Sequence, residues 1–565
     1  MLSFDRRGRK DHAGNGNVRE RGSVAIMTDK YVIAGHRPAR TLMIQGTASD
    51  VGKSILTTAI CRILVQDGYA VAPFKSQNMS LNSYVTPDGK EIGRAQGMQA
   101  DACGIAATTD MNPILLKPTT DRASQVVVHG KPYRTMDAFS YRNEYLAEAG
   151  LIVREALNRL RAEYDVIILE GAGSPAEINL KDRDIVNMRM AGWADAPVIL
   201  VADIDRGGVF ASIVGTLELL EPDERARVKG FIINKFRGDV GLLQPGLDWL
   251  ENRTGKPVLG VIPHIDKLRL ESEDSLSIQT SSLAAGTDEE RLDIAVIRFP
   301  RIANFTDIDP LFAERDTSVR YVTRVEDFGQ PDIVLLPGSK NTAEDLLFLK
   351  ETGLDLAILA HREQGGWLTG ICGGYQMLGQ KLLDPDGIES GNEYLAGLGL
   401  FPMETVFSPD KKTERVFGQA IGWRIGENSA DNSTEDGRTF PMNVPIEGYE
   451  IHMGITSFIQ SVEHPMSIGL KREPGVSETL YHEGARSTDG KVWGTYIHGI
   501  LHNDEFRRNW LNAIRSGKGW MPLEGLLNFN GLREAEFDRL ADHVRRYMNM
   551  PKVYEIIATG QENGQ

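Results

Sequence analysis

Residues 41–54 read TLMIQGTASDVGKS, and residues 55–64, ILTTAICRIL, follow with the apolar spacing of a helix. A strand, a glycine-rich loop and a helix in this order form a phosphate site, because loop N–H groups and the helix dipole attract the anion. Five residues separate Gly46 from Gly52, one more than in the common pattern. The residues predicted to contact the phosphates of ATP are Gly46, Thr47, Gly52, Lys53 and Ser54.

Short apolar runs that end in glycine or acidic residues alternate with helix-like segments along the chain. Such runs are typical of buried parallel strands, whose carboxyl ends gather ligands. They occur in two series, so the sequence predicts two doubly wound α/β domains. The first series is TLMIQG, DVIILEGAG, APVILVADID, VKGFIINKF and PVLGVIP; the second is LDIAVIRFP (292–300), PDIVLLPG (331–338), GWLTGICGG (366–374) and GTYIHGIL (494–501).

Composition shifts along the chain suggest where the domains begin and end. The first forty residues are rich in Arg, Gly and Asp and have no apolar periodicity, which is typical of a disordered extension. A polar, Ser-rich stretch separates the two strand series, and residues 426–439 have the composition of a surface loop. The predicted parts are an extension (1–40), a P-loop domain (41–266), a linker (267–290), a second α/β domain (291–515) and a C-terminal helical segment (516–565).

Overall composition excludes several classes of function. The chain of 565 residues has a net charge of −15, which disfavours nucleic acid as a partner. It lacks the run of about 18 apolar residues that a membrane span needs. Three cysteines in a chain of this length fit a reducing compartment. We therefore expect a cytoplasmic multidomain enzyme, and the sequence leaves a homo-oligomer open.

Polar residues end the other strands of the first domain. Glu170 ends DVIILE, and we predict that it holds Mg²⁺ together with Ser54, although an acidic helix cap would look the same. Asp203 and Asp205 fit a second metal or substrate contact, or a structural turn. We predict that the Asn234 amide meets the adenine edge of the nucleotide.

An amide-rich loop and helix follow the strand that ends near Phe74. The loop APFKSQNMSLNS suits a polar acceptor substrate. In the next helix, Gln96 and Gln99 share one face, which we predict to be polar surface. The residues predicted to contact the acceptor are Lys75, Gln77, Asn78 and Asn82.

The segment GWLTGICGGYQMLG predicts a nucleophile. Cys372 stands at a glycine-flanked turn between a strand and a helix, the pattern of a nucleophile elbow, and a helix N-terminus favours the thiolate. A base must accept the thiol proton; we predict His498 in VWGTYIHGI, with His452 in GYEIHMG as its rival. The backbone N–H groups predicted to hold an oxyanion are those of Gly338 and Ser339, after PDIVLL.

These motifs resemble known families. The segment GICGGYQ with His498 is similar to class I glutamine amidotransferases, although that class carries an acidic residue where Ile500 stands, so the third member of the triad is not identified. The first domain resembles the dethiobiotin synthetase group of ATP-dependent enzymes. Together the two domains resemble the cobyrinate amidases, and within them the cobyric acid synthase family. The matching segments are APFKSQNMSLNS, EGAGSPAEINL, VADIDRGGVFAS, NKFRGD, RIANFTDIDPL, LPGSKNT and GYEIHMG.

The resemblance implies a reaction in cobalamin biosynthesis. ATP with Mg²⁺ would convert a carboxylate to an acyl phosphate, and ammonia released from glutamine at Cys372 would displace the phosphate. The implied acceptor is adenosylcobyrinic acid a,c-diamide, whose b, d, e and g carboxylates are amidated to give adenosylcobyric acid. Because the two reactions lie in separate domains, we also expect an internal passage for ammonia.

Several other functions stay open at this stage. An a,c-diamide synthase or an amidotransferase acting on a cell-wall precursor would share the two-domain organisation. A partitioning ATPase would use the phosphate loop without Cys372, and a cysteine peptidase would use Cys372 without ATP. A joint measurement of glutamine hydrolysis and ATP hydrolysis separates the last two from the amidotransferases.

Overall fold

The computed structural model describes residues 38–119, 123–181, 184–266, 268–270, 290–422, 443–470 and 480–560. The predicted surface loop 426–439 lies outside the described residues, as do nearly all of the predicted extension 1–40 and linker 267–290. In the part of the chain that is described, none of the helices combines the length and the apolar character needed to cross a membrane.

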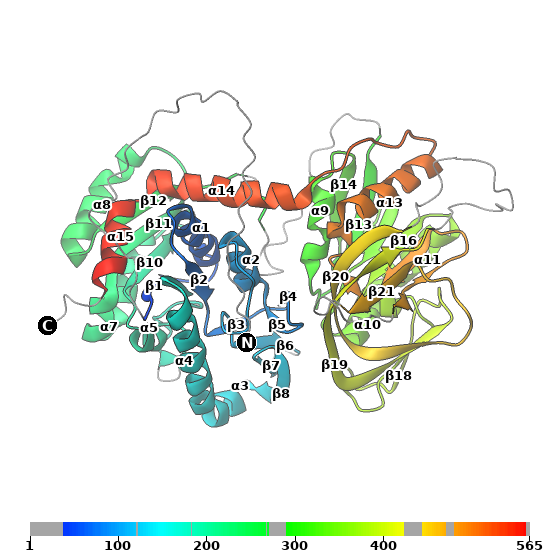
Figure 1. The fold of residues 1–565 in the computed structure, drawn as a ribbon, viewed down its shortest axis with the longest axis horizontal. Coiled ribbons are helices and arrows are strands. Elements are labelled where there is room, and N and C mark those ends of the chain that lie inside the picture. Colours follow the sequence, from blue (N-terminus) through cyan, green and yellow to red (C-terminus); the bar gives the residue numbers. More distant parts are fainter. Residues whose placement is uncertain are drawn as a thin grey trace, which may run out of the picture. The chain divides into compact units, whose positions relative to one another are not determined.

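A six-stranded parallel sheet carries the phosphate loop (Figure 1). Its strand order is β12-β11-β10-β1-β9-β2, so β1 lies inside the sheet and the loop that follows it opens at the carboxyl ends of the strands. All five predicted runs of the first series form strands of this sheet. The strands are β1 (Arg40–Gly46), β2 (Val71–Phe74), β9 (Val166–Glu170), β10 (Val198–Asp203), β11 (Val228–Phe236) and β12 (Val258–Pro263).

Helices cover both faces of this sheet, which explains why its strands are continuously apolar. Leu42 and Ile44 of β1 pack into a core with α1, α14 and α15, whereas Met43 between them packs into a second core with α4, α5, α6 and α8. The helices are α1 (Lys53–Gln66), α2 (Arg94–Ala102), α3 (Ala138–Ser140), α4 (Leu146–Glu163), α5 (Met188–Ala194), α6 (Val209–Leu219), α7 (Pro222–Arg227), α8 (Val240–Thr254), α14 (Phe529–Tyr547) and α15 (Met550–Thr559).

Short strands that the sequence did not predict extend the first domain. They form a four-stranded sheet of order β3-β6-β7-β8 and a β4–β5 hairpin. Helix α2 contacts α1, β2 and both strands of the hairpin. These strands are β3 (Gln77–Met79), β4 (Ser83–Val85), β5 (Glu91–Gly93), β6 (Ile114–Pro118), β7 (Ala123–Val128) and β8 (Lys131–Asp137).

A second six-stranded sheet, of order β14-β13-β15-β16-β24-β23, forms the second α/β domain. Its pairs are parallel except for the edge strand β23. The prediction of two α/β domains is thus confirmed. The elements are β13 (Leu292–Ile297), α9 (Asp309–Ala313), β14 (Thr317–Val322), β15 (Ile333–Leu336), α10 (Thr342–Thr352), α11 (Leu354–Glu363), β16 (Trp367–Ile371), α12 (Gly373–Met377), β23 (Ala485–Arg486), β24 (Val492–Thr495) and α13 (Asp504–Gly517).

A mixed sheet, also not predicted, completes this domain. Its two longest strands, β19 and β20, pair antiparallel, and β25 pairs with β20 so that His498 lies opposite Tyr449. The strands are β17 (Lys381–Leu383), β18 (Tyr394–Ala396), β19 (Met403–Ala420), β20 (Val444–Phe458), β21 (Met466–Leu470), β22 (Tyr481–Glu483) and β25 (Ile497–His498).

Candidate active site

The phosphate loop is held by the neighbouring strand β11. Gly52 has a φ of 98°, and a Cβ there would lie 2.2 Å from Asn234 Nδ2, so no other residue fits without a shift. Asn234 Nδ2 donates to the Val51 carbonyl over 2.8 Å. Lys53 Nζ donates to the carbonyls of Ala48 (2.8 Å) and Gly173 (3.0 Å). Asn234, predicted to meet adenine, therefore lies against the loop itself.

A buried carboxylate, Glu170, gathers polar groups beside the loop. Its Oε1 accepts from Ser54 Oγ (2.8 Å) and Lys75 Nζ (2.9 Å), and its Oε2 accepts from Gln99 Nε2 (2.6 Å). The structure thus brings together three predicted site residues, Ser54, Lys75 and Glu170. Their hydroxyl and carboxylate oxygens are the hard ligands that Mg²⁺ takes alongside water and phosphate oxygens.

The prediction that Gln96 and Gln99 form polar surface is wrong, since both side chains are fully buried. Helix α2 contacts β2 and the β4–β5 hairpin, and a Cβ added at Gly97 would lie 2.2 Å from the Tyr84 ring. The face that sequence spacing alone assigns to solvent is covered by Asn78, which donates to Gln96, and by Glu170, which accepts from Gln99.

The remaining predicted residues of the first domain lie in separate hydrogen-bond networks. Asp203 forms an ion pair with Lys235 (2.8 Å). Asp205 is half-exposed and lies 3.6 Å from the guanidinium of Arg237. Gln77 accepts from Tyr141, and Asn78 donates to Gln96 (2.9 Å). Asn82 Oδ1 accepts from the backbone N–H of Phe305 in the second domain (3.3 Å).

Cys372 occupies a strained turn between β16 and α12. Its φ of 52° and ψ of −108° are unusual for a residue with a side chain, as at a nucleophile elbow. A Cβ at Gly374 would lie 2.1 Å from the Leu336 carbonyl oxygen, and one at Gly370 would lie 2.7 Å from that of Gly374. The flanking glycines therefore allow the turn, and the Cys372 N–H donates to the Thr495 carbonyl, next to the strand that leads to His498 (2.8 Å).

His498 is buried and paired with a carboxylate that the sequence did not identify. Its Nδ1 lies 2.7 Å from Asp307 Oδ2, and Asp307 Oδ1 accepts from the Gly499 N–H (2.8 Å). Burial alone lowers the pKa of His498, but the charge of Asp307 and the interaction with Cys372 raise it to about 10. Asp307 thus takes the place of the acid expected at Ile500. The segment RIANFTDIDPL already contained it.

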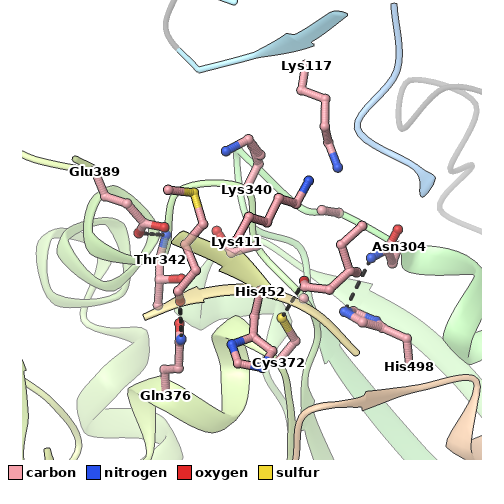
Figure 2. A pocket seen from close by; sticks show the side chains of 15 residues that line it. Lys117, Asn304, Lys340, Thr342, Cys372, Gln376, Glu389, Lys411, His452 and His498 are labelled. Carbon is pink, nitrogen blue, oxygen red and sulfur yellow. Dashed lines mark hydrogen bonds between the residues drawn. The ribbon is translucent and has the colours of Figure 1, made fainter. Parts of the chain in front are cut away.

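His452, the rival base, lies in the same pocket but has a different environment (Figure 2). Its ring stacks on Tyr496 with centroids 3.8 Å apart, and its Nδ1 lies 3.3 Å from the Gly454 carbonyl. Burial lowers the pKa of His452 to about 3, so the ring stays neutral at physiological pH. Among the contacts of the described residues, a carboxylate is paired with His498 and not with His452.

Gly338 and Ser339 line the pocket that holds Cys372 and His498. A Cβ at Gly338 would lie 3.1 Å from His498 Cε1, and a Cβ at Gly373 would lie 3.0 Å from the Ser339 backbone nitrogen. The turn after β15 therefore lies directly beside the elbow, where backbone N–H groups can reach an oxyanion.

Three lysines from two domains share this pocket. Lys340 and Lys411 belong to the second domain, and Lys117 comes from β6 of the first (Figure 2). Buried Glu91 accepts from Lys117 Nζ (2.6 Å) and pairs with Lys411 across the domains. Burial raises the pKa of Glu91, but the two ammonium groups carry it well below its usual range. The wall of the cysteine pocket is thus tied to the first domain.

Comparison with known proteins agrees with this two-part site. Residues 42–278 match the CobQ/CobB/MinD/ParA nucleotide binding domain family, and residues 293–506 match the CobB/CobQ-like glutamine amidotransferase domain family.

Three curated relatives are named cobyric acid synthase. That of Geobacillus kaustophilus (strain HTA426) is 51% identical over 92% of this chain and 98% of its own. That of Geobacillus sp. (strain WCH70) is 51% identical over 92% and 97%, and that of Geobacillus thermodenitrificans (strain NG80-2) is 50% identical over 93% and 100%. This chain therefore belongs to the cobyric acid synthase family.

Proposed function

We propose that this protein amidates the b, d, e and g carboxylates of adenosylcobyrinic acid a,c-diamide, using ATP and ammonia from glutamine, to give adenosylcobyric acid. Family membership supports the product, and the observation that carries the chemistry is a buried Cys372 beside the His498–Asp307 pair. A partitioning ATPase has no use for this constellation, and a peptidase has no use for the nucleotide-binding domain.

Glutamine hydrolysis would begin at Cys372. His498 Nε2 accepts the thiol proton, and Asp307 stabilises the resulting imidazolium through Nδ1–H. The thiolate attacks the side-chain amide carbon, and the N–H groups near Gly338, Ser339 and Gly373 hold the oxyanion. His498 then returns the proton to the leaving nitrogen, so that ammonia departs and a thioester remains for water to cleave.

Carboxylate activation would take place at the phosphate loop. We propose that Gly46, Thr47, Gly52, Lys53 and Ser54 bind the triphosphate and that Ser54 and Glu170 hold Mg²⁺, which neutralises phosphate charge when bound. We propose that Lys75, which pairs with Glu170, contacts the phosphoryl group or the acceptor carboxylate. We further propose that Gln77, Asn78, Asn82, Asp203 and Asp205 serve the acceptor side, and that Asn234 acts by bracing the loop.

Ammonia must travel between the two centres without protonation in bulk water. The presence of Lys117 in the wall of the cysteine pocket, and the Glu91–Lys411 pair, support a passage that leaves this pocket toward the first domain. We also propose that the chain divides into an ATP domain, 41–266, and an amidotransferase domain, 291–515. The two separate six-stranded sheets and the two matched families support this division.

Mass spectrometry of the a,c-diamide incubated with enzyme, ATP, Mg²⁺ and glutamine tests the proposal. We expect four successive mass steps of a hydroxyl-to-amine exchange. A diamide of unchanged mass, together with amidation of unmodified cobyrinic acid or of a cell-wall precursor, would contradict it.

A further inference from the structure

Asn304 lies between the two halves of the proposed mechanism and has no role in it so far. It precedes the 3-10 turn Phe305–Ile308 that carries Asp307, has a φ of 51° and is 4% exposed. Its Oδ1 accepts from the backbone N–H of Ser83, in β4 of the first domain, over 2.8 Å. Its Nδ2 lies 3.3 Å from His498 Nε2 (Figure 2).

The chemistry of an amide fixes which end faces the histidine. The Ser83 N–H can only donate, so it requires the amide oxygen of Asn304, and the amide nitrogen must then face His498. His498 Nδ1 donates to Asp307, so Nε2 is an acceptor when the ring is neutral and a donor in the imidazolium, which the charge of Asp307 and the interaction with Cys372 favour. The Asn304 NH₂ group faces Nε2, where it can donate to the neutral ring but meets an N–H in the imidazolium. Asn304 therefore opposes Asp307 and Cys372 and favours the neutral ring, whose lone pair must accept the Cys372 proton.

We propose that Asn304 is a positioning residue that keeps His498 from accepting the Cys372 proton as long as Ser83 of the first domain stays bonded to it. When Ser83 withdraws, the amide turns over and presents Oδ1 to His498. The proton then moves from Cys372 Sγ to His498 Nε2, and the new Nε2–H donates to Asn304. One proton is transferred, and no other covalent bond changes.

The segment that contains Ser83 links the loss of the Ser83–Asn304 hydrogen bond to binding of the acceptor. Neighbouring Asn82 also contacts the same turn, through the Phe305 N–H, and belongs to the loop that we assign to acceptor binding. Ser83 Oγ donates to Glu91 (2.6 Å), and Lys117 Nζ lies 2.7 Å from this hydroxyl. An acceptor that draws this loop toward the phosphates would pull Ser83 away from Asn304. This inference rests on the proposed function, because it assigns His498 the role of base.

Substitution Asn304→Asp tests the inference as a gain of reactivity. A carboxylate offers oxygen to both neighbours, so it keeps the Ser83 N–H bond and accepts from protonated His498 without any release. Without acceptor, we expect iodoacetamide to alkylate Cys372 about tenfold faster than in the wild type, the scale of one hydrogen bond to a charged group. Stimulation of glutamine hydrolysis by acceptor plus ATP should nearly vanish.

Asn512→Asp is the matched control. This amide also bridges a backbone donor and acceptor, both of Leu523, and should keep wild-type alkylation and stimulation. Alkylation of Asn304→Asp no faster than that of the wild type would overturn the inference.

If Asn304→Asp does not fold, the alkylation rate of Cys372 in the wild-type protein still tests the inference. Acceptor plus ATP should accelerate Cys372 alkylation, and equal rates with and without them would overturn the inference. Failure of the proposed function is distinguishable, because the mass of the diamide would then stay unchanged on incubation with ATP, Mg²⁺ and glutamine. Amidation of the diamide without faster Cys372 alkylation would overturn the inference alone.

Discussion

Asp307→Asn tests the assignment of the third catalytic group. Asp307 accepts from His498 Nδ1 over 2.7 Å and from the Gly499 N–H over 2.8 Å. The amide can keep the Gly499 bond, but it then turns an NH₂ toward Nδ1 and drives the imidazole proton onto Nε2, the atom that must accept the thiol proton. One hydrogen bond to a charged group is worth about 1.5–3 kcal/mol, or about 10- to 150-fold in rate.

The wrong tautomer adds to this loss, and the same change in a Ser-His-Asp triad costs about 10⁴ in kcat. We therefore expect glutamate release to fall at least about 100-fold, while amidation with free ammonia continues. Asp327→Asn, an exposed partner of Arg324 in the same domain, is the matched control. Glutamate release by Asp307→Asn at the wild-type rate would refute the role of Asp307.

Three further predictions concern the nucleophile, the phosphate loop and stability. Cys372→Ser should abolish glutamine use yet keep amidation with ammonium salts; loss of both would contradict the division of labour. Gly52→Ala should abolish ATP turnover and spare Cys372 alkylation, because its Cβ meets Asn234 at a φ of 98°; wild-type ATP turnover would argue against the loop geometry. Arg508→Met removes one of the arginine partners of buried Glu314 and Asp316, which keep Arg507 and Arg515, and should cost about 1.5–3 kcal/mol in urea unfolding. Exposed Arg324→Met should cost less.

Features set by local sequence were predictable. The phosphate loop and the cysteine elbow each need a strand, a few glycines and a helix in direct succession, so Lys53, Ser54 and Cys372 could be found by reading alone. The parallel strands were equally visible, because burial on both faces leaves continuous apolar runs such as that of β10.

Features that depend on distant segments were not predictable. Asp307 is 191 residues from His498 in the chain, so a search next to the histidine reached only Ile500. Gln99 was assigned to surface because its helix face is polar, but its partner Glu170 is 71 residues away in the chain, so local spacing does not show that this face is buried. The contact of Asn304 with Ser83 joins two domains and has no local signature.

The central claim is that nitrogen freed at Cys372 reaches the acceptor inside the protein. Glutamine labelled with nitrogen-15 in its side-chain amide, supplied with excess unlabelled ammonium, tests it directly by mass spectrometry of the corrinoid. We predict that each new carboxamide carries the label undiluted. New carboxamides with the isotopic composition of the bulk ammonium, formed while glutamine is hydrolysed, would contradict the claim.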